Sequence, residues 1–118
     1  MDQRLVRALG SFITRSTDYS LARLEFSMKF PDSPTPPVLD RLPDASEATL
    51  RERWEGLEAQ LHRAVDYVKL IELQQRTTER SDSSFLWLKR TVRELDQYAR
   101  ALRWVLTVTE ADASEGAP

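Results

Sequence analysis

The single histidine, His62, is the residue best suited to proton transfer or metal binding. Glu58 precedes it by four positions and Asp66 follows it by four, so in a helix the three side chains would share one face. Helical di-iron sites instead use Glu-x-x-His at a step of three on two separate helices, and the chain contains no such pair. We therefore predict no metal site and interpret His62 as an exposed histidine between two carboxylates.

Other residue types that support catalysis are missing or scattered. The chain has no cysteine, which removes thiolate nucleophiles, thiolate metal ligands and disulfides. Its three glycines are isolated, so there is no glycine-rich phosphate loop. No serine is accompanied by a base and an orienting acid that the sequence could identify. We predict that the protein is not an enzyme, with no catalytic residue and no cofactor.

A basic stripe is the most function-like charged feature. It consists of Lys89, Arg93, Arg100 and Arg103 on one side of the helix expected over residues 85–108, and Asp96 interrupts it. Cations along several helical turns could follow the phosphates of a nucleic acid or meet an acidic partner. The alternative is a solvated face that pairs with acidic residues of the preceding helix, namely Glu52, Glu55 and Glu58. The matching negative excess of that helix favours the alternative.

Large side chains off the main apolar line of the same helix suggest a partner surface. They are Trp87, Tyr98, Trp104 and Val105. Tryptophan is enriched at interface hot spots, and three tryptophans exceed what the core of a small helical domain usually needs. We predict that these four residues bind a partner. The competing interpretation places Trp87 and Trp104 in the core.

Two long helices must position these residues. Apolar residues recur at steps of three and four in both, the spacing of helices packed lengthwise. The first line is Leu50, Trp54, Leu57, Leu61, Ala64, Val68 and Ile71, and the second is Phe85, Leu88, Val92, Leu95, Ala99, Leu102 and Leu106. The polar stretch 77–83 between them is a turn, with Ser81 or Asp82 capping the second helix. This pattern predicts a long antiparallel helical hairpin over residues 46–109.

Residues 1–30 form an N-terminal amphipathic segment. Leu5, Val6, Leu9, Phe12 and Ile13 are expected on one helical face. A core helix is favoured over a mitochondrial presequence, against which the acidic residues argue, and over a helix lying on a membrane surface. Residues 18–30 fit a helix, which we favour, or a strand in which Leu24, Phe26, Met28 and Phe30 alternate with polar residues.

Five prolines make residues 31–45 an extended Pro-rich connection that we expect to lie along the bundle. Asp44 or Ser46 is expected to cap the helix that follows. Residues 110–118 are predicted to be an acidic disordered tail. The fold class is therefore all-α, a three- or four-helix bundle in which residues 1–30 pack on the hairpin.

Size and composition complete the prediction. The chain has 118 residues and a net charge of −2, and this length is enough for one domain that is stable without a disulfide or a metal site. It has no apolar run long enough to span a membrane. We expect a cytoplasmic helical protein-protein interaction module that acts as an adaptor, assembly subunit or regulatory accessory and binds a protein partner or itself. The alternative is a small helical subunit that contacts a nucleic acid backbone through the basic stripe.

Overall fold

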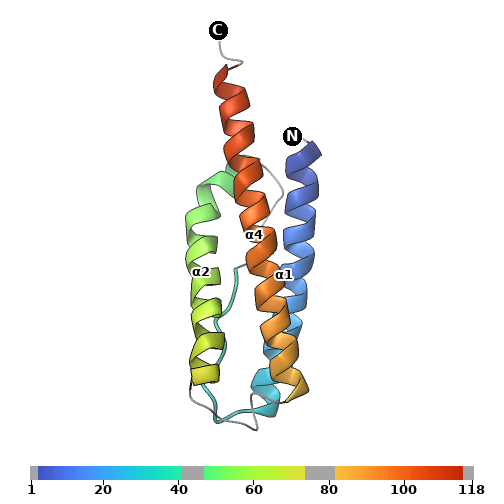
Figure 1. The fold of residues 1–118 in the computed structure, drawn as a ribbon, viewed down its shortest axis with the longest axis vertical. Coiled ribbons are helices and arrows are strands. Elements are labelled where there is room, and N and C mark those ends of the chain that lie inside the picture. Colours follow the sequence, from blue (N-terminus) through green and yellow to red (C-terminus); the bar gives the residue numbers. More distant parts are fainter. Residues whose placement is uncertain (1–2, 41–46, 74–81, 116–118) are drawn as a thin grey trace.

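Three long helices make up the chain. The computed structural model describes residues 3–40, 47–73 and 82–115, and within them the helices are α1 (Gln3–Lys29), α2 (Glu47–Leu73) and α4 (Ser83–Glu115). These residues include no strand, which confirms the all-α class and shows that residues 18–29 are helical. In Figure 1, α1 and α2 run in the same direction and α4 runs antiparallel to both.

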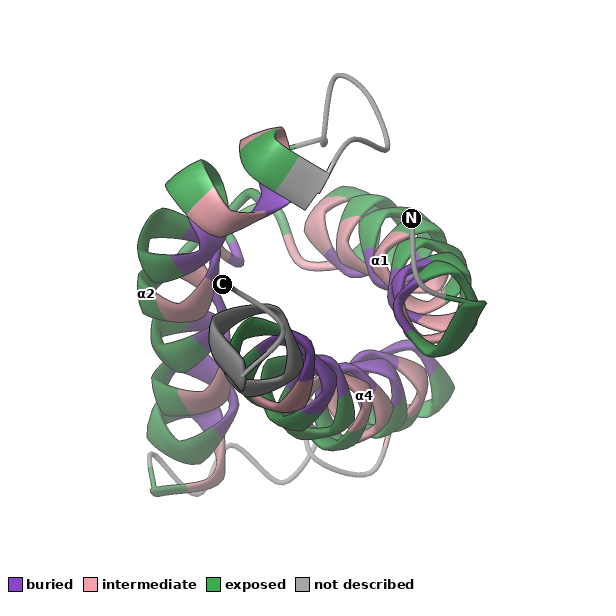
Figure 2. Ribbon diagram, turned by 90° about the horizontal axis from the view of Figure 1, so that it is seen from above, coloured by how far each residue is buried: buried purple, intermediate pink, exposed green. Residues whose placement is uncertain are grey.

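Helix α4 holds the bundle together. It contacts both α1 and α2, and it packs more extensively on α1 than on α2 (Figure 2). In the described residues the backbones of α1 and α2 do not come close, and aromatic side chains make the contact between them: the ring centroids of Phe12 and Trp54 lie 5.9 Å apart. All residues of the two predicted apolar lines are buried. The antiparallel arrangement of α2 and α4 follows the prediction, but the closest helix pair is α1 with α4, and these two helices are far apart in the sequence.

An aromatic cluster joins the three helices at one end of the bundle. The ring of Phe26, from α1, has its centroid 6.2 Å from that of Tyr67 on α2 and 6.0 Å from that of Phe85 on α4. The ring centroid of Phe30 lies 5.0 Å from that of Phe26. Such tilted and edge-on contacts contribute beyond the burial of area alone. Phe26 therefore stands where all three helices meet.

Helix α1 buries a different face from the one expected in its first half. Leu5, Leu9 and Phe12 are buried, whereas Val6 and Ile13 are exposed, so the expectation that all five share the core face is wrong. The physical reason is that α4, Trp54 of α2 and the Pro-rich connection cover α1 from one side, so the opposite side stays exposed. Val6 and Ile13 lie about 100° round the helix from Leu5 and Phe12.

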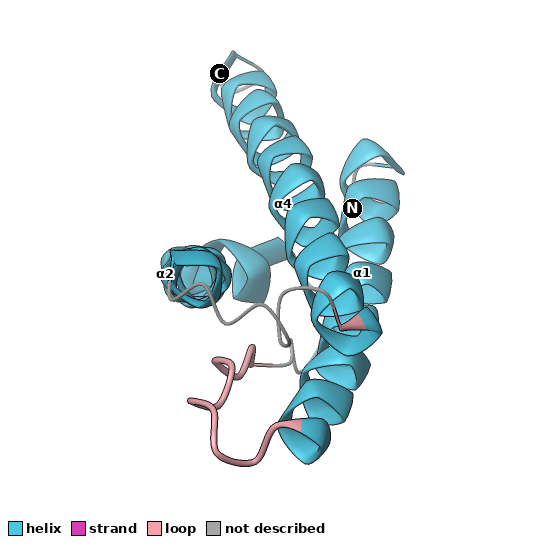
Figure 3. Cartoon of the chain, turned by 60° about the horizontal axis from the view of Figure 1, so that its bottom comes forward, coloured by secondary structure: helices cyan, strands magenta, loops and turns pink. Residues whose placement is uncertain are grey.

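The Pro-rich connection, described as far as Asp40, is drawn as a loop without helix or strand in Figure 3, and in Figure 1 it runs along the bundle between α1 and α2. Proline has no N–H group but keeps its carbonyl as an acceptor, and side chains of α1 and α2 donate to these carbonyls. The Tyr19 hydroxyl donates to the Pro37 oxygen at 2.5 Å, and the Tyr67 hydroxyl donates to the Pro34 oxygen. Three further contacts hold the segment: Arg23 Nε donates to the Pro36 oxygen at 2.8 Å, Asp40 N donates to Gln60 Oε1 at 2.8 Å, and Gln60 Nε2 donates to Asp40 Oδ2 at 2.8 Å. The connection thus bridges α1 and α2.

The ends of the helices follow local chemistry where they are described. Helix α1 ends at Lys29, shortly before Pro31. Asp82 caps α4, because its Oδ1 accepts a hydrogen bond from Ser84 N at 2.8 Å. Helix α4 continues to Glu115, so the backbone of residues 110–115 is helical where a disordered tail was expected. The predicted caps at Asp44 and Ser46 and most of the 77–83 turn lie outside the described residues.

Candidate interaction surfaces

The basic stripe is largely neutralised by neighbouring carboxylates. Lys89 forms an ion pair with Glu72 of α2, and Arg103 Nη1 lies 3.4 Å from Glu58 Oε2 of the same helix. Arg100 Nη2 lies 3.1 Å from Asp96 Oδ2 on α4 itself. Arg93 is exposed and has no ion pair among the described residues. Three of the four predicted cations therefore take part in ion pairs of this chain.

An arginine that the sequence did not single out fastens α2 to α4. Arg51 Nη2 donates to the Leu106 carbonyl at 3.1 Å and to Thr109 Oγ1 at 2.8 Å, and Nη1 lies 3.6 Å from Glu110 Oε2. The planar guanidinium carries several N–H donors, so it can donate to a carbonyl and a hydroxyl at the same time. The groove between α2 and α4 thus holds contacts within the chain.

Tyr98 is occupied within the chain by an arginine of α1. Arg15 Nη2 donates to the Tyr98 hydroxyl at 3.3 Å, and the guanidinium carbon lies 4.8 Å from the ring centroid. Glu94 and Asp18 also approach this guanidinium, at 3.8 and 3.6 Å. The hydrogen bond to Tyr98 is the main reason why the pKa of Arg15 is raised. Tyr98 therefore joins α1 to α4, and only part of it remains accessible to a partner.

The other three predicted partner residues differ in exposure. Val105 is only 9% exposed and belongs to the core cluster, so its expected place outside the core is wrong; α4 packs on two helices and therefore buries more than one line of residues. Trp104 is 63% exposed. Trp87 is half-buried, packing on the core while it lines a groove on the outside.

That groove is a shallow, largely apolar surface feature formed by α1 and α4. Leu21, Leu24 and Met28 of α1 line it together with Trp87 of α4, and Glu25 and Lys29 stand at its edge. Leu24 is 54% exposed and Met28 is 76% exposed. We call these four apolar residues the Trp87 groove. In a helix, Leu21, Leu24 and Met28 fall on one line and Ala22 and Phe26 on the next, and nothing in the sequence distinguishes the exposed line from the buried one.

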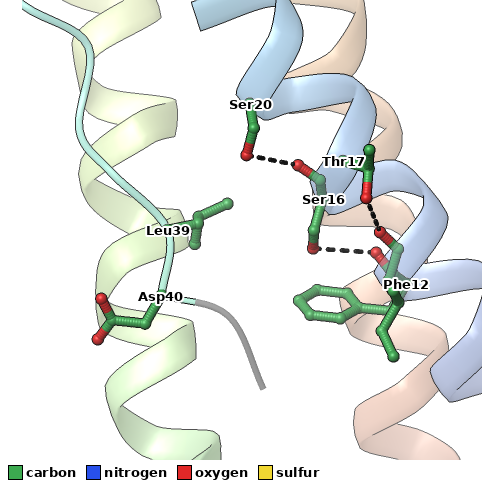
Figure 4. A pocket seen from close by; sticks show the side chains of 7 residues that line it. Phe12, Ser16, Thr17, Ser20, Leu39 and Asp40 are labelled. Carbon is green, nitrogen blue, oxygen red and sulfur yellow. Dashed lines mark hydrogen bonds between the residues drawn. The ribbon is translucent and has the colours of Figure 1, made fainter. Parts of the chain in front are cut away.

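The residues suited to chemistry do not converge. His62 is exposed, and Glu58 is engaged by Arg103. A cavity of about 230 Å³ lies between α1 and the connection (Figure 4). Its hydroxyls at Ser16, Thr17 and Ser20 all donate to carbonyls of their own helix, and dashed lines mark these hydrogen bonds in Figure 4. In the described part of the chain no group of three histidine, cysteine or acidic residues could hold a metal ion.

Comparison with known proteins adds no relative. No protein family model, no curated protein and no solved structure matches the chain. Among the described residues, no helix has both the length and the apolar character needed to cross a bilayer.

Proposed function

We propose that this chain is a cytoplasmic, non-enzymatic helical interaction module that serves as an adaptor, an assembly subunit or a regulatory accessory of a larger complex. The observation that carries the proposal is the Trp87 groove, where Leu21, Leu24, Met28 and Trp87 meet on an outer face. Isolated exposed apolar residues are ordinary on a protein surface, whereas contiguous ones mark contact sites.

The fold does not depend on burying the apolar residues of this groove. Helix α1 already has a buried face that includes Leu5, Phe12 and Phe26, each at most 3% exposed. Leu21, Leu24 and Met28 of the groove lie on another side of α1, and only residues of α1 and α4 line the groove. Covering them by a partner would remove apolar surface from water, which favours association by roughly 25 cal/mol per Å². Trp104, the most exposed of the predicted partner residues, is a second candidate contact.

The test is a crosslinking experiment in cells that produce the chain. A photoreactive residue in place of Met28 should yield a discrete crosslinked product, because that side chain stands at the open edge of the groove. Leu24→Glu and Trp87→Ala should remove the product. Leu70→Glu, at a comparably exposed leucine on α2, is the matched control and should retain it. A product that persists in Leu24→Glu, or no product at all, would overturn the proposal.

The alternative function, contact with a nucleic acid backbone, has less support. Ion pairs occupy Lys89, Arg100 and Arg103, which leaves Arg93 as the stripe residue best able to bind a phosphate. The purified protein should therefore elute with a protein-like ratio of absorbance at 260 and 280 nm at low and high salt. Co-eluting nucleic acid that is lost from the Arg93→Glu variant would reverse this preference.

A further inference from the structure

An exposed stripe runs along the whole of α1 and extends the Trp87 groove. Its members are Val6, Gly10, Ile13, Thr17, Leu21, Leu24 and Met28, and all seven are exposed. Their spacing is four, three, four and again four, three, four, which is an eleven-residue repeat. At about 100° per residue, eleven residues return to within about 20° of the starting direction, so the stripe stays on one face. We call this face the α1 outer stripe.

Gly10 has no explanation inside the chain. Glycine is the poorest helix former after proline, and it is usually kept where another backbone must approach closely. A Cβ atom at Gly10 would meet nothing within 4 Å, so no neighbour within the described structure requires glycine there. A small residue in the middle of an apolar stripe would allow a second helix to come close.

The order of large and small residues is complementary to itself when reversed. Thr17 is the middle of the stripe, with eleven residues to Val6 on one side and eleven to Met28 on the other. If a second copy of α1 ran antiparallel with its Thr17 opposite this one, Gly10 would face Leu24 and Val6 would face Met28. Gly10 of each copy would then receive the Leu24 side chain of the other, and Thr17 would face Thr17 at the centre.

Two charged residues beside the stripe agree with this direction. Arg7 directly follows Val6 and Glu25 directly follows Leu24, so both stand on the same flank of the stripe, about 100° round the helix. Neither has an ion-pair partner among the described residues, whereas Lys29 further round is paired with Asp82.

In an antiparallel helix pair, each flank faces the same flank of the other helix. Arg7 of each copy would then stand near Glu25 of the other, displaced by about two residues, or ~3 Å, along the axis. This contact would form twice, as two-fold symmetry requires. In a parallel pair the two residues would face opposite flanks and could not meet in this way.

We propose that the partner of this surface is a second copy of the chain, packed antiparallel along the α1 outer stripe with the two-fold axis at Thr17. The inference rests on the proposed function and names its partner. Trp87, beside Met28, would cover Val6 of the second copy. The contact is isologous, so it closes as a dimer and leaves no open stripe.

The first measurement is sedimentation equilibrium of the purified protein over a range of concentrations. A monomer-dimer equilibrium is expected, and Leu24→Glu should weaken it by about 100-fold or more because both copies lose a central apolar contact. Leu70→Glu on α2 should leave it unchanged. Gly10→Lys is a second test variant, and lysine favours the helix more than glycine does, so the substitution should not unfold α1. Gly56→Lys is the matched control, since a Cβ at Gly56 also meets nothing within 4 Å.

Gly10→Lys should weaken the dimer and Gly56→Lys should not. A chain that stays monomeric at every concentration would overturn the inference. The proposed function would survive that result if the Met28 crosslink joined the chain to a different protein and still depended on Leu24.

The direction of packing is tested with introduced cysteines, which are unambiguous because the chain has none of its own. Thr17→Cys should crosslink efficiently to itself with a short thiol reagent. Val6→Cys alone should not, since the two copies of position 6 would be separated by about 33 Å along the axis. A mixture of Val6→Cys and Met28→Cys chains should crosslink.

Efficient crosslinking of Val6→Cys alone would show a parallel pair and overturn the inference.

Reversing the charges of Arg7 and Glu25 gives a second check. Arg7→Glu should weaken the dimer several-fold, and adding Glu25→Arg should restore it. Failure of the double variant to restore association would contradict the predicted pairing.

Discussion

Replacing Tyr19 with phenylalanine would test whether the Pro-rich connection is part of the folded core. Tyr19 is 1% exposed, and its hydroxyl donates to the Pro37 oxygen at 2.5 Å. Such a hydrogen bond contributes about 0.5–1.5 kcal/mol net, and removing its donor leaves a carbonyl without that partner. We expect Tyr19→Phe to lower the free energy of unfolding by about 1 kcal/mol at pH 7.

The same substitution should have the opposite effect in alkaline solution. Burial raises the pKa of Tyr19 well above its ordinary value of 10.0, because the phenolate would lose its hydration. Above pH 10 the unfolded chain releases this proton while the folded chain retains it, so the wild type loses about 1.4 kcal/mol of stability per pH unit from this group. Phenylalanine does not titrate. The difference between the two proteins should vanish near pH 11 and then favour Tyr19→Phe.

Urea unfolding followed by far-UV circular dichroism at pH 7, 10 and 11 would measure this difference. Amide exchange of Asp40, whose N–H donates to Gln60, reports separately on whether the connection has loosened. Tyr98→Phe is the control at pH 7, since that hydroxyl accepts from Arg15 on another side of α1. A difference that is constant across the pH range, or equal loosening of the connection in both variants, would refute the reasoning.

Three further predictions concern the helices. Phe26→Ala should reduce the free energy of unfolding by about 3–5 kcal/mol in urea titrations, because it leaves a cavity where the three helices meet. The hydrogen bond from Lys29 lowers the pKa of Asp82, so the ionised carboxylate stabilises the fold. Asp82→Asn should therefore be less stable at pH 7, and the difference should disappear in acid titrations as the pH falls below 3.8, the ordinary pKa of that carboxyl. Gly56→Ala should raise the free energy of unfolding by about 1 kcal/mol in urea titrations, because alanine favours the helix and a Cβ at this site meets nothing within 4 Å. An unchanged free energy of unfolding would contradict the absence of close neighbours around Gly56.

The helices themselves could be predicted from the sequence because their signal is local. The lines through Leu57 and Leu95 repeat every three or four residues, and such a repeat buries one side of a helix whatever covers it. The Asp82 cap and the proline-terminated end of α1 depend on chemistry within a few residues, so they were within reach as well.

The pairing of the helices could not be predicted in the same way. A short turn between two matched helices suggested α2 as the main neighbour of α4, but α1 packs on α4 more extensively. The Pro-rich connection bridges α1 and α2 through contacts such as those of Tyr19 and Tyr67, and no local pattern announces hydrogen bonds across so many residues.

The candidate surface was only partly accessible to sequence reasoning. Trp87 was predicted to face a partner, and it does line an exposed groove. Val105 was assigned to the same role, but a helix with two neighbours buries positions on two of its sides. The outer stripe of α1 was missed because Val6 and Ile13 had been grouped with Leu5 and Phe12, and only the position of α4 separates the two sets.

The pairing of α1 with α4 also determines the order of events during synthesis. Helix α1 is made first and its main neighbour is made last, so the ribosome must add all of residues 30–82 before α4 can begin to cover Leu5 and Leu9. At about 5–20 residues per second, this delay lasts several seconds. Throughout that interval two apolar faces of α1 are exposed to water: the face with Leu5 and Leu9, which α4 later covers, and the α1 outer stripe, which the finished bundle leaves exposed. We therefore expect α1 to be the helix of the nascent chain that waits longest for its main neighbour.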